Sequence, residues 1–150
     1  MHTETQISVF MVNKPGVLAQ VLTEIAKAKV NLIAITMMDS VEHGVMRLIG
    51  RSPVKIRTVL KKLNMAFSET DVLCVTLSNK AGALADITQK LSQAHINISY
   101  AYCTAGAKGG KTTGILKVAD VKKAIKVLAS HADKAGKSKP TVRRSPASRR

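Results

Sequence analysis

The chain has 150 residues, a formal net charge of +15 and an apolar content of 45%, which is ordinary for a globular protein. Aromatic residues make up only 3%, so the core has to be built from Val, Ile, Leu, Met and Ala. No apolar run approaches the roughly 18 residues that span a bilayer, and the N-terminus has no basic-then-apolar signal pattern. We therefore expect a cytoplasmic protein with no membrane segment.

The cysteines and histidines give no sign of a metal or catalytic site. Cys74 and Cys103 lie far apart, and two reduced thiols are the expectation where no secretion signal is present. Cys103 either faces a pocket or is a buried, inert thiol, and the second alternative is favoured. The four histidines lack ligand spacing, so we expect no metal, no cofactor and no catalytic residues.

The predicted elements follow one order in both halves of the chain, and each half begins with a strand that leads into an amphipathic helix. In the first half they are strand 6–12, a helix from the turn at 13–16 to about 29, strand 30–38, strand 45–50, a helix that starts at Ser52-Pro53, and a short strand 66–71. In the second half they are strand 72–78, helix 82–94, strand 96–103, strand 113–118, and a helix capped by Asp120.

A repeat with a spacing of 66 residues explains this order. Asn-Lys-Pro-Gly-Val-Leu-Ala at 13–19 matches Asn-Lys-Ala-Gly-Ala-Leu-Ala at 79–85, and the same shift aligns 30–33 with 96–99. Each copy predicts a β-α-β-β-α order, which is the ferredoxin-like plan of an antiparallel sheet with two helices on one face. The fold class is α+β, with domains at 1–70 and 71–131.

The second copy has no convincing last strand. The repeat shift carries residues 66–71 onto 132–137, which have little to bury and low strand propensity. Residues 132–150 are rich in Lys, Arg, Ser, Pro and Ala and are predicted to form a disordered basic tail. The tail either contacts nucleic acid through its phosphates or is a solubilising terminus, and the second alternative is favoured.

The first strand is apolar on both sides. Ile7, Val9 and Met11 alternate with Phe10 and Val12, whereas the helices can cover only one face of such a sheet. We expect the other face to meet another protein surface, for example that of a second chain. The alternative is a solvated face with two isolated apolar residues.

The repeated Asn-Lys-x-Gly turn has the chemistry of a small-ligand site. The first turn of a helix has backbone N–H groups without internal partners, and the helix dipole adds partial positive charge there, so a carboxylate fits. Glycine permits close approach, and Asn13 and Asn79 offer groups that suit an ammonium. Together these groups suggest an α-amino acid, while the alternative is a tight turn that needs glycine only for its backbone angle.

Both repeats resemble ACT domains, small βαββαβ regulatory modules, through the turns at 13–18 and 79–84 and the segments Val30-Asn31-Leu32 and Ile96-Asn97-Ile98. The resemblance covers residues 6–130 and implies that units pair side by side through their second strands, with amino-acid effectors bound at the seam. One implied set is Asn13, Pro15, Gly16, Val17 and Leu18 against the strand of Asn97. The other is Asn79, Gly82, Ala83 and Leu84 against the strand of Asn31. Ala81 replaces the usual proline of the family.

From these features we expect a non-enzymatic, homodimeric regulatory protein that senses a free amino acid and acts on an enzyme partner. The small, aliphatic seam residues favour an apolar or medium-sized ligand side chain. The alternative is a basic nucleic-acid-associated protein whose ACT pair only dimerises. A glycine-rich segment, 105–112, approaches the P-loop pattern, but a strand follows it where a P-loop requires a helix.

Overall fold

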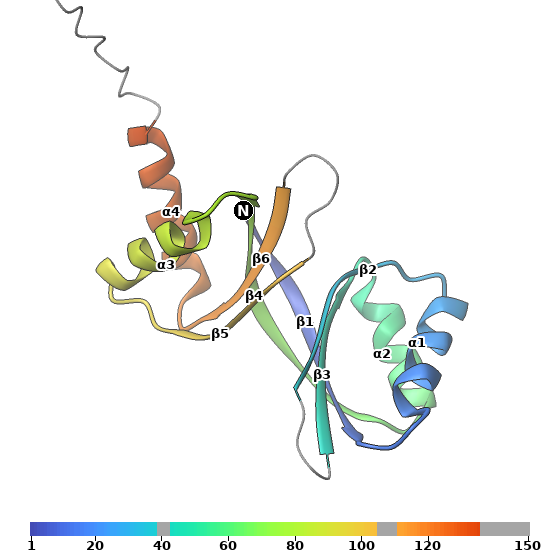
Figure 1. Cartoon of the computed structure of the whole chain (residues 1–150). Helices are drawn as coiled ribbons and strands as arrows, with labels where there is room; N and C mark the ends of the chain where they lie inside the picture. The colour runs from blue at the N-terminus through green and yellow to red at the C-terminus, as the bar shows by residue number, and fades with distance from the viewer. Residues whose placement is uncertain (39–42, 105–110, 136–150) are drawn as a thin grey trace, which may run out of the picture.

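The computed structural model describes residues 1–38, 43–104 and 111–135, with side chains described as far as residue 130. It forms strands and helices in the order βαββαβαββα (Figure 1). The elements are β1 (His2–Val12), α1 (Val17–Lys27), β2 (Leu32–Met38), β3 (His43–Gly50), α2 (Pro53–Lys62), β4 (Ala66–Ser78), α3 (Ala83–Gln93), β5 (Ile98–Cys103), β6 (Lys111–Val118) and α4 (Val121–Ala135). Residues 39–42, between the predicted strands 30–38 and 45–50, and most of the glycine-rich segment, 105–110, lie outside the described residues.

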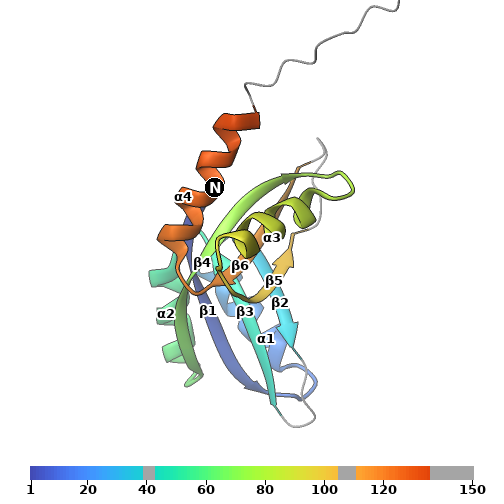
Figure 2. The ribbon, with the colours of Figure 1, turned by 90° about the vertical axis from the view of Figure 1, so that its left-hand side faces the viewer.

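All six strands form one antiparallel sheet in the order β2-β3-β1-β4-β6-β5, which confirms the α+β class and the continuous sheet. The two long strands β1 and β4 occupy its centre and pair along residues 2–10 and 66–74 (Figure 2). β4 combines two elements predicted separately, the last strand of the first copy and the first strand of the second. The pairing of these two strands therefore joins the two repeats.

The N-terminus supplies the strand that the second copy lacks. β1 begins at His2, four residues before the predicted strand, and residues 2–5 pair with residues 71–74. Residues 66–71 complete the first repeat in the same manner, beside residues 5–10 of β1. The second repeat thus takes its last strand from the start of the first repeat. α4 continues to Ala135, beyond the predicted start of the tail. The boundaries 1–70 and 71–131 stay a prediction.

Each pair of helices covers one side of its own half of the sheet, because each helix has an apolar stripe that faces the strands. In the first half, α1 and α2 bury Val21, Ile25, Ile56 and Leu60 against Ile7 and other strand residues. In the second half, Leu91, Ala124 and Leu128 pack against Leu73 and Leu116. Lys29, Asn64 and His95 lie two positions beyond the ends of α1, α2 and α3, have positive φ angles of 54° to 55° and close the last turns with backbone hydrogen bonds.

The sheet curls so that the helix-free sides of its two halves face each other. Figure 1 shows α1 and α2 at one end of the molecule, α3 and α4 at the other, and the strands between them. A third apolar cluster joins strands of both repeats on this inner side and consists of Ala34, Ile49, Val72, Cys74 and Ile115, with Ile33 and Tyr102 packed against it. The repeats therefore contact one another back to back as well as through the sheet.

The helix-free face of β1 is covered along only half of its length. Gln6 is fully buried and Ser8 nearly so, whereas Phe10 and Val12 are 48% and 45% exposed. The second repeat of the same chain thus covers part of the helix-free face of β1, for which the apolar pattern predicted contact with a protein surface. The expectation that a second chain covers Phe10 and Val12 stays a prediction. None of the helices in the described part of the chain has the length and apolar character to cross a bilayer.

Candidate ligand-binding site

The two glycine turns have the same backbone structure. Gly16 and Gly82 precede α1 and α3 with φ angles of +88° and +86°, in the left-handed region where glycine has no Cβ penalty. In the first turn the N–H groups of Lys14, Val17 and Gln20 donate to the carbonyls of Val12, Lys14 and Gly16 at 2.9, 3.4 and 2.9 Å. In the second turn those of Lys80, Ala83 and Asp86 donate to Ser78, Lys80 and Gly82 at 2.8, 3.2 and 2.9 Å.

Space and hydrogen-bond donors lie together above both turns. A Cβ added at Gly16 or Gly82 would meet no described atom within 4 Å. The N-cap residue of each helix is a glycine and has no side chain to cap it, so the first-turn amides, such as that of Leu18, have no backbone partner within the helix. Asp86 lies in the first helical turn of α3, while α1 has no acidic residue in its first helical turn. The glycine turn before α1 is therefore the more favourable anion site.

The predicted site residues are accessible but are divided among separate places. Asn13, Pro15, Gly16, Asn79 and Gly82 are exposed in the turns, Leu18 and Leu84 are 36% and 37% exposed, and Val17 and Ala83 are half-buried. Asn31 and Asn97 are exposed just before β2 and β5. Each turn is a compact group, and each asparagine lies next to a sheet edge.

The seam implied by the family resemblance is not formed within the chain. The resemblance pairs the second strands of the two repeats, but β2 and β5 occupy opposite edges of the sheet. The physical reason is the length of β1 and β4, which run through both repeats and place their first strands at the centre. Consequently the turn of Asn13 does not meet the strand of Asn97 within one chain, nor that of Asn79 the strand of Asn31.

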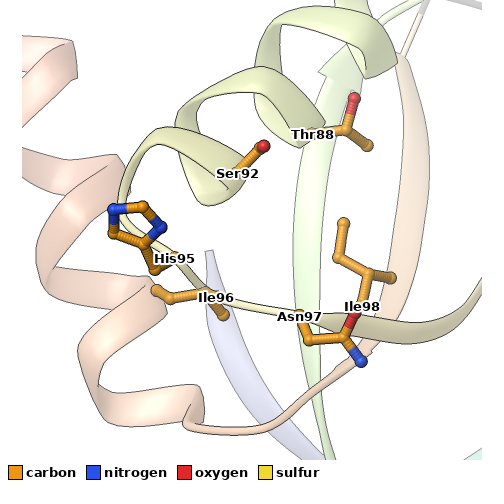
Figure 3. Close-up of a pocket in the computed structure, with 6 residues that line it drawn as sticks. All are labelled: Thr88, Ser92, His95, Ile96, Asn97 and Ile98. Atoms are coloured by element: carbon orange, nitrogen blue, oxygen red, sulfur yellow. The ribbon is translucent and has the colours of Figure 1, made fainter.

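An open cavity of about 420 Å³ lies beside the β5 edge (Figure 3). The second half of α3 supplies Thr88 and Ser92, and the turn into β5 supplies His95, Ile96 and Asn97, with Ile98 beyond. Asn97 is the predicted site residue in this group, while the three polar residues before it were not predicted. Their spacing on one helix face, at 88, 92 and 95, was the signal available in the sequence.

A polar cluster that the sequence did not indicate connects the repeats on the helix-free side. The Gln6 side-chain amide donates to the Tyr100 hydroxyl at 2.6 Å, and the Tyr102 hydroxyl donates to Gln6 Oε1 at 3.0 Å. The Arg47 guanidinium lies 4.2 Å from the centre of the Tyr100 ring. Burial raises the pKa of the Tyr102 hydroxyl, and Tyr100 adds to this effect.

These contacts bear on the nucleic-acid alternative. Tyr100 and Tyr102 are aromatic residues that could stack on bases, and both lie on one face of β5. That face is turned toward the first repeat, and both hydroxyls are bonded to Gln6. The two rings therefore brace the repeats against each other and do not form an exposed stacking platform.

The two thiols differ in accessibility. Cys74 is fully buried in the cluster between the repeats, and burial raises its pKa to about 11. Cys103 is exposed, so the favoured interpretation of it as a buried thiol is wrong. Neither forms a disulfide, and the described residues contain no group of three or more His, Cys, Asp or Glu side chains placed to hold a metal ion.

The fold and the paired turns agree with known proteins. A family model described as an ACT domain pair matches residues 2–134, and the chain belongs to this family. Protein BT0572 from Bacteroides thetaiotaomicron is 30% identical, with a TM-score of 0.80 over 87% of this chain and 89% of that one. A comparison with curated proteins finds no match.

Two aspartate kinase structures share the fold at lower identity. The structure of the aspartokinase alpha and beta subunits is 22% identical, with a TM-score of 0.59 over 87% of this chain and 93% of that one. The ligand-free regulatory subunit of aspartate kinase from Thermus thermophilus is 13% identical, with a TM-score of 0.61 over 89% of this chain and 97% of that one. This chain thus shares the fold of an ACT pair with both structures.

Proposed function

We propose that this protein is a non-enzymatic regulator that binds a free amino acid at a seam between ACT units of two chains. The observation that carries the proposal is the open space above Gly16 and Gly82, next to backbone donors that α1 and α3 leave unpaired. A ligand carboxylate would accept from these amides, and Asn13 or Asn79 would orient its ammonium.

The sheet edges support a seam between chains. β2 is an edge strand, and its Ile35 and Met37 are each 43% exposed on the helix side, together with Leu18 of α1 at 36%. An edge strand with exposed apolar side chains is a template for pairing with another chain. The β2 edge of one chain against the β5 edge of its partner would give a closed homodimer.

The register of the strands supports the same residue pairing that the family resemblance implies. Met38 pairs with Val45, which pairs with Phe10, so the end of β2 lies level with the end of β1 and its glycine turn. Antiparallel edge pairing brings the start of one strand opposite the end of the other. Asn97 of one chain would then face the turn of Asn13 in its partner, and Asn31 would face the turn of Asn79.

The regulated partner is inferred from the class of the fold. ACT pairs are regulatory, and the aspartate kinase regulatory subunit resembles this chain along nearly its whole length. We infer an enzyme of amino-acid metabolism as the partner. The ligand would stabilise one arrangement of the two chains and so shift the population that this partner recognises.

A thermal-shift panel of the twenty amino acids tests the proposal. A ligand at 100 times its Kd adds about 2.7 kcal/mol to the free energy of unfolding, so one or a few amino acids should raise the Tm by several degrees. Asn97→Ala should reduce the shift, while Ser99→Ala, two residues further along in β5, should leave it unchanged. A flat panel would contradict the proposal, and salt-sensitive DNA retention by the same sample would then favour the nucleic-acid alternative.

A further inference from the structure

At two of three polar positions that line the cavity beside β5, the first repeat has an apolar residue instead. The 66-residue shift maps Thr88, Ser92 and His95 onto Leu22, Ala26 and Lys29. Leu22 packs against the apolar core between the helices and strands of the first repeat, whereas Thr88 and Ser92 line an open cavity. Asparagine follows in both repeats, at 31 and 97. The two candidate sites therefore share their turn chemistry but differ in the lining next to the asparagine.

Backbone hydrogen bonds fix the polar lining in position. The N–H of His95 donates to the Ser92 carbonyl at 2.9 Å, and the N–H of Ile96 donates to the Leu91 carbonyl at 2.9 Å, which closes the end of α3. The Asn97 carbonyl accepts from the N–H of Ala119 at 3.3 Å. The Lys123 ammonium donates to the Ala94 carbonyl at 3.0 Å and ties α4 to this turn.

The hydrogen-bonding capacity of the lining indicates what it binds. Thr88 Oγ1 already donates to the Ala85 carbonyl at 2.9 Å, so its donor is used within the helix. Ser92 can donate through its hydroxyl and Asn97 through its amide, and the His95 ring carries at least one further N–H. Figure 3 shows these side chains around the opening, with Ile96 and Ile98 as its apolar part. Such a set of donors is matched by a ligand oxygen that accepts more than one hydrogen bond.

We propose that this cavity receives the side chain of the bound amino acid and selects one that ends in a carboxylate or a carboxamide. The proposal rests on the function proposed above and assigns Ser92, His95 and Asn97 as the residues that determine specificity in the second repeat. A volume of about 420 Å³ lies within the range of small-molecule sites. The first repeat has Leu22, Ala26 and Lys29 at the equivalent positions, so it does not offer this combination of hydroxyl and imidazole donors.

Titration calorimetry on the full chain tests the proposal with six ligands: aspartate, glutamate, asparagine, glutamine, leucine and valine. The acids and amides should bind at least tenfold more tightly than the aliphatic pair, because an unpaired donor in the site penalises a ligand without an acceptor. The four polar ligands also separate a carboxylate from a carboxamide preference.

The internal repeat supplies the variants. Ser92→Ala should weaken the polar ligand about tenfold, the equivalent of one lost hydrogen bond of about 1.4 kcal/mol. Thr88→Leu combined with Ser92→Ala introduces the two apolar residues of the first repeat and should abolish the preference for the polar ligand. His95→Asn keeps a residue that tolerates positive φ, as Asn64 does, and tests the ring alone. Thr23→Ala, on the exposed side of α1, is the matched control and should leave binding unchanged.

The outcomes separate this inference from the proposed function. If none of the twenty amino acids binds the unaltered chain, both are wrong. If the chain binds an aliphatic amino acid most tightly, or if Thr88→Leu with Ser92→Ala keeps the original preference, the polar cavity is not the selective element although amino-acid binding stands. The ligand panel on the unaltered chain decides the question even where a variant does not fold.

Discussion

Thr5 and Asp71 face each other across β1 and β4, and the 66-residue shift maps one onto the other. This pair therefore marks the pseudo-twofold axis that relates the repeats. On one side of this pair, residues 2–5 complete the sheet of the second repeat, and on the other side residues 66–71 complete that of the first. Both glycine turns lie at the far ends of these central strands, so the axis within the chain cannot bring them together.

Removal of residues 1–4 should destabilise the second repeat more than the first. Val72, Leu73 and Cys74 are fully buried and would lose their strand neighbours on the β1 side. The loss of two or three backbone hydrogen bonds should lower the free energy of unfolding by about 2–3 kcal/mol in urea titrations. Hydrogen exchange should accelerate first in residues 71–74. His2→Ala, which removes only a surface contact with the Glu4 carboxylate, should cost less than about 0.5 kcal/mol, and a loss equal to that of the truncation would contradict the role of residues 2–5 as the last strand of the second repeat.

Features encoded by local sequence were predictable. The turns at Gly16 and Gly82 and the amphipathic helices follow from glycine and from apolar spacing. Asp120 caps α4 as predicted, since its Oδ1 accepts the Lys123 N–H at 2.9 Å. Ser52 precedes α2, but its side chain makes no cap hydrogen bond, because its φ and ψ angles of −136° and 86° do not aim it at the first turn.

Features that depend on distant partners were not predictable. Thr3, Glu4 and Thr5 have no apolar alternation, so nothing local marks them as a strand. They form one because they pair with residues 71–73 of β4. Gln6 bonds to Tyr100 and Tyr102, more than ninety positions away, and no periodicity carries such a pairing. The position of β2 at the sheet edge likewise depends on which strands pair and not on the residues of β2.

Gly16→Ala should lower the free energy of unfolding by about 1–2 kcal/mol, because the φ angle of +88° is unfavourable for a residue with a Cβ even where the space is open. Gly16→Asn should cost less, since asparagine tolerates the left-handed region. Urea unfolding of the three proteins measures both effects. Equal costs for alanine and asparagine would show that contacts, and not backbone angle, govern this position.

Stability should fall between pH 9 and pH 11 in a way that depends on Cys74. Burial, with a contribution from the Glu4 carboxylate, raises the pKa of its thiol from 9.0 to about 11. Above pH 9 the unfolded chain releases this proton and the folded chain retains it. The free energy of unfolding therefore falls by at most about 1.4 kcal/mol per pH unit. Below pH 9 the contribution of the Cys74 thiol to the free energy of unfolding is fully present. Urea titrations at pH 8 and 10 should show a larger loss for the unaltered chain than for Cys74→Ala, and parallel losses would contradict the assignment.

The bond between Gln6 and Tyr102 should act as an energetic link between the repeats. Gln6→Leu leaves two buried or half-buried hydroxyls, those of Tyr100 and Tyr102, without this partner and should cost about 1–3 kcal/mol. Tyr102→Phe removes one of the unpaired groups, so the double variant should cost about 1 kcal/mol less than the two single costs together.

A second cycle controls for this coupling. Gln6→Leu with Thr58→Ala, whose hydroxyl bonds only within α2 to the Val54 carbonyl at 3.1 Å, should be additive within about 0.5 kcal/mol. Urea unfolding of each protein yields the required free energies. Additivity in both cycles would mean that Gln6 and Tyr102 contribute independently, and the back-to-back contact would then rest on the apolar cluster of Val72, Cys74 and Ile115 alone.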